Sequence, residues 1–291
     1  IFRTSNGKIH CLDAFCSHMG LRLSTGKVSG DKIQCKFHHW QYNGAGEVHD
    51  AGCEKLNTHR NLNSYPVEVR YGLIWIWAGT APAYPLPYHP ELKEGEFSYK
   101  LGALYSRPSH PHISLLNALD IQHVNTVHAL ELNVTAKHFE PDDGSFIHYN
   151  FEATFQKTSK AGKRNTWLTG GGYKFSVRYA GSTVGFLKAL EGIKLFGKIP
   201  FPTIYATFGY RQIENSRTMI QPIFLTPHRK GFIGKIKSWL HLRLTEVIYN
   251  RLKNEDGEIY ENIRFTPNLT SEDSNITHFI AHVNRLPKSS F

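Results

Sequence analysis

The chain has 291 residues, of which 40% are hydrophobic and 20% are charged, a balance that is typical of a globular protein. No apolar run reaches the roughly 18 residues that a membrane-spanning helix requires. The formal net charge is +10. No basic run with interleaved aromatic residues accompanies this charge, so the sequence argues against nucleic-acid binding, and the charge is compatible with an acidic protein partner.

The first part of the chain is rich in strand signals. Two strand-like runs flank a turn at Asn6-Gly7, an abrupt beginning that predicts missing N-terminal strands. Short alternating runs, separated by glycine and asparagine turns, continue to about residue 80. Four prolines then fall within 80–96, as in a linker. We therefore predict a small all-β domain over 1–82 and a second domain over 83–291.

Four potential metal ligands lie close together in the first domain. Cys16 and His18 form a C-x-H pair, and after sixteen intervening residues Cys35 and His38 form a C-x-x-H pair. Zinc accepts two Cys and two His, but zinc fingers usually pair Cys with Cys and His with His. The alternating order instead favours a two-iron cluster in which one iron binds both Cys and the other binds both His. Zinc is the alternative, and we expect the adjacent His39 to be a bystander.

The second domain contains a predicted helix that carries a further group of ligands. Apolar residues recur at helical spacing over 114–132, a segment that includes Asn117, Asp120, His123 and His128. Two His and one carboxylate form a facial triad, which leaves open positions on ferrous iron. The five-residue spacing separates the two His by about 140° on an ideal helix. The sequence therefore predicts a π-bulge or an irregular turn between them.

The two Cys/His pairs, together with Gly20, Trp40 and the hairpin at 42–46, resemble the Rieske iron–sulfur domain. Followed by the His pair of the predicted helix, they resemble the catalytic α subunit of Rieske non-haem iron oxygenases over nearly the whole chain. This resemblance implies an α+β fold, in which a helix-grip (START-like) catalytic domain with a large antiparallel sheet follows the Rieske domain. The chain departs from the family at Lys36, where many members have Pro, and at Leu116, where Glu is frequent.

The resemblance also assigns roles to individual residues. In the family, the residues that match His123 and His128 bind a mononuclear iron. Asp120 would link His123 to His38 of a neighbouring subunit in a head-to-tail trimer and act as an electron bridge. Asn117 is a further candidate catalytic residue.

The triad needs a carboxylate from a later part of the chain. The tract 254–273 resembles the C-terminal tract of ketosteroid-hydroxylase oxygenases, and that match favours Asp256, which we expect to begin a short helix. Asp273 is the alternative ligand. Cys11 and Cys53 are predicted to be small buried hydrophobic residues rather than ligands.

A basic helical region is predicted over 230–265. Its first part mixes Lys and Arg with Phe232, Ile233, Ile236, Trp239 and Leu240. Such a helix either lies on a membrane surface or packs its apolar residues on the core. Base rates favour packing on the core, so peripheral membrane contact is the less favoured interpretation.

The resemblance implies a terminal oxygenase that uses a Rieske [2Fe-2S] cluster, mononuclear Fe(II) and O2 to hydroxylate or dioxygenate a hydrophobic aromatic or steroid-like substrate. Electrons from NAD(P)H would reach it through a reductase or ferredoxin. An oxidative demethylase or desaturase of the same family and a non-enzymatic Rieske electron-transfer protein are the alternatives. We expect a homotrimer and a cytoplasmic location.

Overall fold

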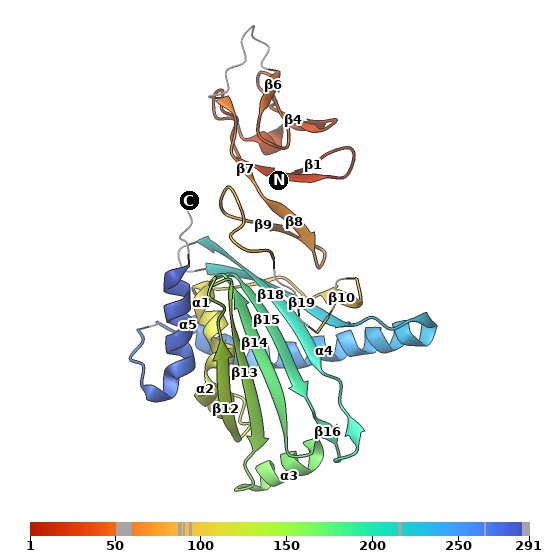
Figure 1. Cartoon of the computed structure of the whole chain (residues 1–291), viewed down its shortest axis with the longest axis vertical. Helices are drawn as coiled ribbons and strands as arrows, with labels where there is room; N and C mark the ends of the chain where they lie inside the picture. The colour runs from red at the N-terminus through yellow and green to blue at the C-terminus, as the bar shows by residue number, and fades with distance from the viewer. Residues whose placement is uncertain are drawn as a thin grey trace. The chain divides into compact units, whose positions relative to one another are not determined.

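A computed structural model of the chain separates into two compact units, Ile1–Leu86 and Pro87–Leu286 (Figure 1). The structure describes residues 1–50, 60–86, 89, 91–92, 95–214, 217–264 and 266–286. Cys53 lies outside the described residues. No helix within these ranges combines the length and the apolar composition needed to cross a bilayer.

The first unit consists of short antiparallel strands around a small core. The predicted turn at Asn6-Gly7 is present, because β1 pairs with β2 and Gly7 adopts a φ of 88°. Trp40 and Tyr42 are fully buried at the centre of the unit. Its described elements are β1 (Phe2–Arg3), β2 (Ile9–Leu12), η1 (Leu23–Thr25), β3 (Lys27–Ser29), β4 (Lys32–Gln34), β5 (Gln41–Tyr42), β6 (Val48–Asp50), β7 (Ser64–Tyr65), β8 (Val67–Arg70) and β9 (Leu73–Ile76).

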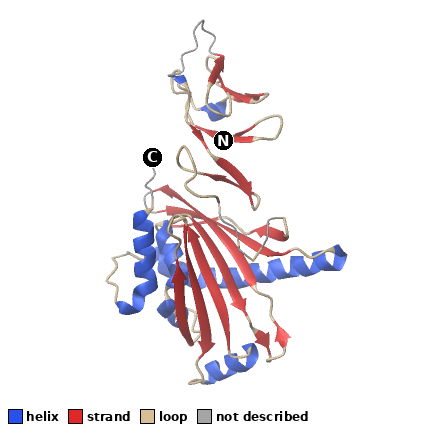
Figure 2. Cartoon of the chain, in the orientation of Figure 1, coloured by secondary structure: helices blue, strands red, loops and turns tan. Residues whose placement is uncertain are grey.

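The second unit is built on one eight-stranded antiparallel sheet of order β10-β19-β18-β15-β14-β13-β12, with β11 also paired to β19 (Figure 2). Alternate residues of β13 are buried, as expected for a strand with one face on a core. The sheet strands are β10 (Phe97–Leu101), β11 (Tyr105–Arg107), β12 (Leu132–Phe139), β13 (Phe146–Phe155), β14 (Gly172–Ala180), β15 (Val184–Glu191), β18 (Ile204–Glu214) and β19 (Arg217–Pro227), and a separate hairpin joins β16 (Lys194–Leu195) to β17 (Ile199–Pro200).

Helices complete the core of the second unit. Leu115 and Leu119 pack with Phe279 against Tyr149 and Tyr179 of the sheet. A long helix, α4, lies against β19 and β10 (Figure 1). A small all-β region followed by a large antiparallel sheet with helices confirms the expected fold class. The helical elements are α1 (Pro111–Leu116), η3 (Asn117–Leu119), α2 (Ile121–Thr126), α3 (Lys160–Thr169), α4 (Gly231–Asn262), η4 (Ser271–Asp273) and α5 (Ser274–Arg285).

The single helix predicted over 114–132 is wrong in its extent. The segment is broken into α1, η3 and α2, and Asp120 between η3 and α2 is extended, with φ −83° and ψ 98°. The Asp120 carboxylate accepts a hydrogen bond from the backbone N–H of His123 at 2.9 Å and so caps α2. A short polar side chain that bonds to its own backbone competes with helix continuation, which explains the break.

The short helix expected to begin at Asp256 is also wrong, because Asp256 lies inside the 32-residue helix α4. The helix continues through the adjacent Gly257, although glycine is unfavourable inside a helix. A Cβ atom at Gly257 would lie 2.7 Å from Nη1 of Arg107, so the glycine lets that side chain cross close to the helix. Arg107 there donates to the carbonyl of Lys253 at 2.6 Å.

Candidate metal centres

The four predicted cluster ligands lie on two loops of the first unit. Cys16 and His18 follow β2, and Cys35 and His38 lie between β4 and β5. Both Cys side chains are buried, whereas His18 is half-buried and His38 is exposed. The loops therefore direct two thiols inward and leave two imidazoles near the surface.

Backbone hydrogen bonds and aromatic contacts hold these loops in shape. The N–H of Cys16 donates to the carbonyl of Leu21 at 2.9 Å, and the N–H of Cys35 donates to the carbonyl of Trp40 at 2.8 Å. The Trp40 ring stacks on His18, with ring centroids 4.4 Å apart and planes 3° from parallel. The Tyr42 hydroxyl lies 3.1 Å from Sγ of Cys16. A hydroxyl beside a ligand sulfur is a group that tunes the reduction potential of an iron–sulfur cluster.

Two features fit these residues to a two-iron cluster. Nδ1 of His18 is buried but has no hydrogen-bond partner within the described residues. A buried ring nitrogen without a partner is costly unless something else, such as a metal, accepts its lone pair. The His18 and His38 rings lie side by side, with centroids 4.5 Å apart. His39 takes up the turn of its loop with a φ of 60°, and Cys11 is buried on β2 outside both loops.

A second group of ligand atoms meets in the second unit. Nε2 of His123 lies 3.2 Å from Nε2 of His128, and Oδ1 of Asp256 lies 2.9 Å and 3.2 Å from these two nitrogens. Metal–ligand bonds of about 2.1 Å place neighbouring ligand atoms about 3.0 Å apart on an octahedron and about 3.4 Å apart on a tetrahedron. The observed spacings agree with one face of an octahedron, the arrangement of a facial triad.

The end of helix α2 brings the two His together. The N–H of Val127 makes an α-helical bond to the carbonyl of His123 at 2.8 Å, and His128 lies beyond the helix in an irregular turn. Ala129 and Glu131 then adopt φ values of 49° and 52° before β12 begins. The predicted distortion between the two His is therefore the termination of the helix, and α2 contains no π-bulge.

Glu255, which the sequence did not single out, orients His128. Its Oε2 lies 2.7 Å from Nδ1 of His128, and that hydrogen bond lowers the pKa of the Glu255 carboxyl. An ionised carboxylate only accepts, so Nδ1 donates and Nε2 keeps its lone pair for a metal. Arg251 donates from Nε to the other carboxylate oxygen at 3.1 Å. The only sequence signal for this role was a carboxylate adjacent to the proposed ligand Asp256.

Asn117 orients Asp256 in a similar way. Its Nδ2 donates to Oδ2 of Asp256 at 2.8 Å, whereas the buried Oδ1 makes no hydrogen bond within the described residues. Burial raises the pKa of Asp256, but His123 and His128 outweigh it and lower the pKa to about 2. The chain thus presents an ionised carboxylate with one oxygen free beside two imidazoles.

The two remaining candidate carboxylates, Asp120 and Asp273, lie at the beginnings of helices. Oδ1 of Asp120 caps α2, and its second oxygen has no hydrogen-bond donor within the described residues. Oδ2 of Asp273 accepts from the N–H of Thr270 at 2.8 Å and from its hydroxyl at 3.0 Å, in a capping box before α5. The described group of potential metal ligands includes Asp256 and not Asp273.

Comparison with known proteins matches a family model, the Rieske [2Fe-2S] domain, to residues 1–66. Aminopyrrolnitrin oxygenase PrnD of Pseudomonas fluorescens is 31% identical over 147 residues, which cover 45% of this chain and 39% of that protein. Cholesterol 7-desaturase nvd of Bombyx mori is 32% identical over 137 residues, which cover 45% of this chain and 30% of that protein. The matched regions thus span less than half the length of these two relatives.

A longer match extends over both units. The oxygenase component of 3-ketosteroid-9-alpha-monooxygenase from Mycolicibacterium smegmatis is 25% identical over 301 residues, covering 95% of this chain and 76% of that protein. Among solved structures, dicamba monooxygenase bound to dicamba shares the fold, with a TM-score of 0.67, 16% identity, and coverage of 98% of this chain and 88% of that chain. The chain therefore contains a Rieske [2Fe-2S] domain over residues 1–66, and beyond that domain it is similar to Rieske oxygenases, among which are monooxygenases and desaturases.

Proposed function

We propose that this chain is a terminal oxygenase that hydroxylates or otherwise oxygenates a bulky, hydrophobic substrate. The observation that carries the proposal is the set of ligand atoms from His123, His128 and Asp256, spaced 2.9–3.2 Å apart, in a chain that also has a Rieske domain. An electron carrier has no use for a second set of ligands. When bound, the cluster supplies single electrons, and ferrous iron supplies a site where dioxygen is activated.

The residues of the chain divide the work as follows. Cys16, His18, Cys35 and His38 hold the cluster, and the exposed position of His38 leaves it accessible to a neighbouring subunit. In the second site, Asn117 and Glu255 fix the orientation of the two ligands that they contact. The charge of +10 suits an acidic reductase or ferredoxin as the electron donor. We propose that the boundary between the Rieske domain and the catalytic domain lies near residue 82. We also propose that the protein is cytoplasmic.

The substrate class rests on relatives alone. The Mycolicibacterium smegmatis relative, whose match covers 95% of this chain, is a 3-ketosteroid monooxygenase component. The Bombyx mori relative is a cholesterol desaturase. We therefore propose a steroid-like substrate, with a hydrophobic aromatic compound as the alternative. Oxidative demethylation and desaturation are the alternative outcomes within the same family.

The test is turnover with ¹⁸O2. The full chain, loaded with iron and sulfide and supplied with a surrogate reductase, is incubated with a panel of ketosteroids, sterols and polycyclic aromatics, and products are identified by mass spectrometry. We expect one ¹⁸O atom in a hydroxylated product, or two in a diol, and about three irons per chain. His123→Ala should abolish product and retain the rhombic signal of the reduced cluster. A protein that binds only two irons and turns over no compound would be an electron carrier instead.

We also propose that electrons pass between subunits of a head-to-tail trimer through Asp120. The free carboxylate oxygen of Asp120 could accept a hydrogen bond from His38 of a neighbour. Light scattering should give a mass near three chains of 33.2 kDa. Asp120→Asn should retain both metals and slow the reoxidation of the reduced cluster by dioxygen and substrate. A monomer with full activity contradicts the trimer.

A further inference from the structure

The first half of α4 exposes its apolar side chains, in contrast to the packing expected from the sequence. Phe232 is 78% exposed and Trp239 is 57% exposed. The prediction that the apolar residues of this helix pack on the core is therefore wrong for this segment. The exposed set consists of Phe232, Ile233, Ile236, Trp239 and Leu240.

The side of the helix that packs on the sheet is largely polar. With 100° per residue, the five exposed apolar residues fall within an arc of about 120°, and the buried residues fall on the opposite side. There, Nδ1 of His241 lies 2.7 Å from Oγ1 of Thr226, and Ser238 and Thr245 are also buried. A helix that buries polar residues and exposes apolar ones is the inverse of an ordinary amphipathic helix. Packing against the residues that the structure describes does not explain the exposed face.

The exposed face is bordered by positive charge. The segment 229–245 contains five Lys or Arg and no Asp or Glu. Lys235 and Lys237 fall on opposite flanks of the apolar arc, and neither makes an ion pair within the parts of the chain that the structure describes. Arg243 lies within the arc, over the ring of Trp239 at 5.8 Å. An apolar stripe flanked by cations is the pattern of a helix that lies in a membrane interface.

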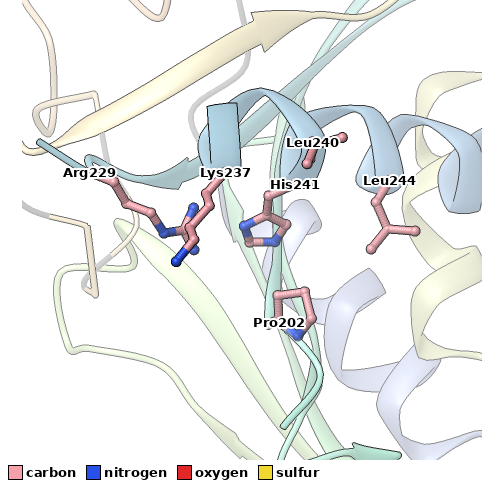
Figure 3. A pocket seen from close by; sticks show the side chains of 6 residues that line it. All are labelled: Pro202, Arg229, Lys237, Leu240, His241 and Leu244. Atoms are coloured by element: carbon pink, nitrogen blue, oxygen red, sulfur yellow. The ribbon is translucent and has the colours of Figure 1, made fainter. Parts of the chain in front are cut away.

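A pocket of about 320 Å³ adjoins this face (Figure 3). Arg229 and Lys237 bring their cationic groups to it from neighbouring segments, as Figure 3 shows. Its apolar wall consists of Pro202, Leu240 and Leu244. Two cations beside an apolar wall are the groups that would bind a phosphate attached to a hydrocarbon-rich molecule.

We propose that the first half of α4 docks on an anionic membrane surface, with Phe232 and Trp239 entering the headgroup region and Arg229 and Lys237 binding lipid phosphate. A symmetric pair of copies is a poor occupant, since it would oppose two faces of the same positive charge. An anionic bilayer matches both the charge and the apolar stripe. Asp256 lies 17 residues after Trp239 on the same helix, about 25 Å along its axis.

The test is flotation of the cluster- and iron-loaded full chain with vesicles. We expect binding to phosphatidylcholine vesicles that contain about 30% phosphatidylglycerol, weaker binding as salt is added, and no binding to phosphatidylcholine alone. The double variants Phe232→Ser/Trp239→Ser and Lys235→Glu/Lys237→Glu should each reduce the bound fraction about ten-fold or more. Trp167→Ser and Lys160→Glu/Lys163→Glu, matched exposed changes on α3, should leave binding intact.

Folding of each variant is checked by the cluster spectrum and by the iron content per chain, which should both match the parent. Trp239→Phe, which keeps an aromatic ring, should retain binding and exclude a merely structural role for this residue. Failure of the parent chain to float with anionic vesicles, or equal binding to neutral ones, overturns the proposal. A change in oligomeric mass in Phe232→Ser/Trp239→Ser overturns it too and makes the face an interface between copies.

Discussion

The two candidate metal centres of this chain are built in different ways. The cluster ligands fall within 23 residues, on two loops of a small β unit, with both imidazoles near the surface. The ligands of the second centre span 134 residues and come from α2, the turn after it and α4, with His123 and Asp256 buried. Surface imidazoles suit electron exchange with a partner, whereas a buried triad suits chemistry shielded from water. The first centre thus depends on local loop geometry and the second on tertiary packing.

The largest expected effect is loss of the cluster with retention of the mononuclear iron. Cys35→Ser removes a thiolate that lies in the same buried group as Trp40 and Tyr42. We expect loss of the cluster, a lower melting temperature for the first unit, and about one iron per chain in place of three. Electron spin resonance and metal analysis give the measurement. Cys11→Ser, a buried Cys outside the loops, should keep the rhombic signal; its loss there would mean that the ligand set is different.

The reciprocal change acts on the second centre. Asp256→Asn removes the ionised ligand, so iron should fall from about three to about two per chain and turnover by about three orders of magnitude or more. The cluster spectrum should not change. Asp273→Asn is the matched control, because that carboxylate caps a helix end, and its loss should cost only about 1 kcal/mol of stability. Loss of iron in Asp273→Asn, with iron retained in Asp256→Asn, would reverse the assignment.

A smaller effect tests whether packing between helices orients the second centre. Glu255→Gln removes the charge that holds His128, and iron affinity measured by chelator competition should fall about 10–100-fold. Arg251→Gln is the control. Its side chain is 82% exposed and pairs with the other oxygen of Glu255, so its loss should change affinity only slightly. Equal effects of the two substitutions would show that Glu255 acts through general charge and not through its hydrogen bond.

Acid should also distinguish the centres. In the iron-free chain Asp256 raises the pKa of His128, so protons compete for this ligand at pH values where an isolated imidazole is neutral. Iron affinity should therefore be constant above the raised pKa and fall about ten-fold per pH unit below it. Chelator titrations across pH 5 to 8 measure the slope, with the cluster absorption followed in parallel. Affinity that rises on acidification would contradict a His ligand at this position.

The candidate cluster site could be proposed from the sequence because the four residues that form it are local. Short loops between adjacent strands fix the distance between Cys35 and His38, so the spacing carries the geometry. The sequence also showed that two His five residues apart need a break in the helix. It did not show that the break begins at Asp120, since a capping hydrogen bond is decided by competition between side chain and backbone.

The second centre was less accessible to sequence reasoning. The choice of Asp256 came from resemblance to ketosteroid hydroxylases, because a ligand more than 120 residues away has no local signature. The role of Glu255 was missed for the same reason: it depends on α4 lying beside the end of α2. The amphipathic pattern of 229–244 was recognised, but periodicity alone does not say which face of a helix turns inward.

Because Asp256 lies inside α4, the number of residues in the preceding part of this helix cannot change without moving its carboxylate. One residue inserted between Thr245, which is buried against the sheet, and Asp256 would turn the carboxylate by about 100° and move it by about 1.5 Å. The same insertion in the segment after Asn262 would leave Asp256 in place. Length variants should therefore be tolerated after α4 and rejected within 246–255. The number of helical residues before Asp256 therefore determines where its carboxylate lies.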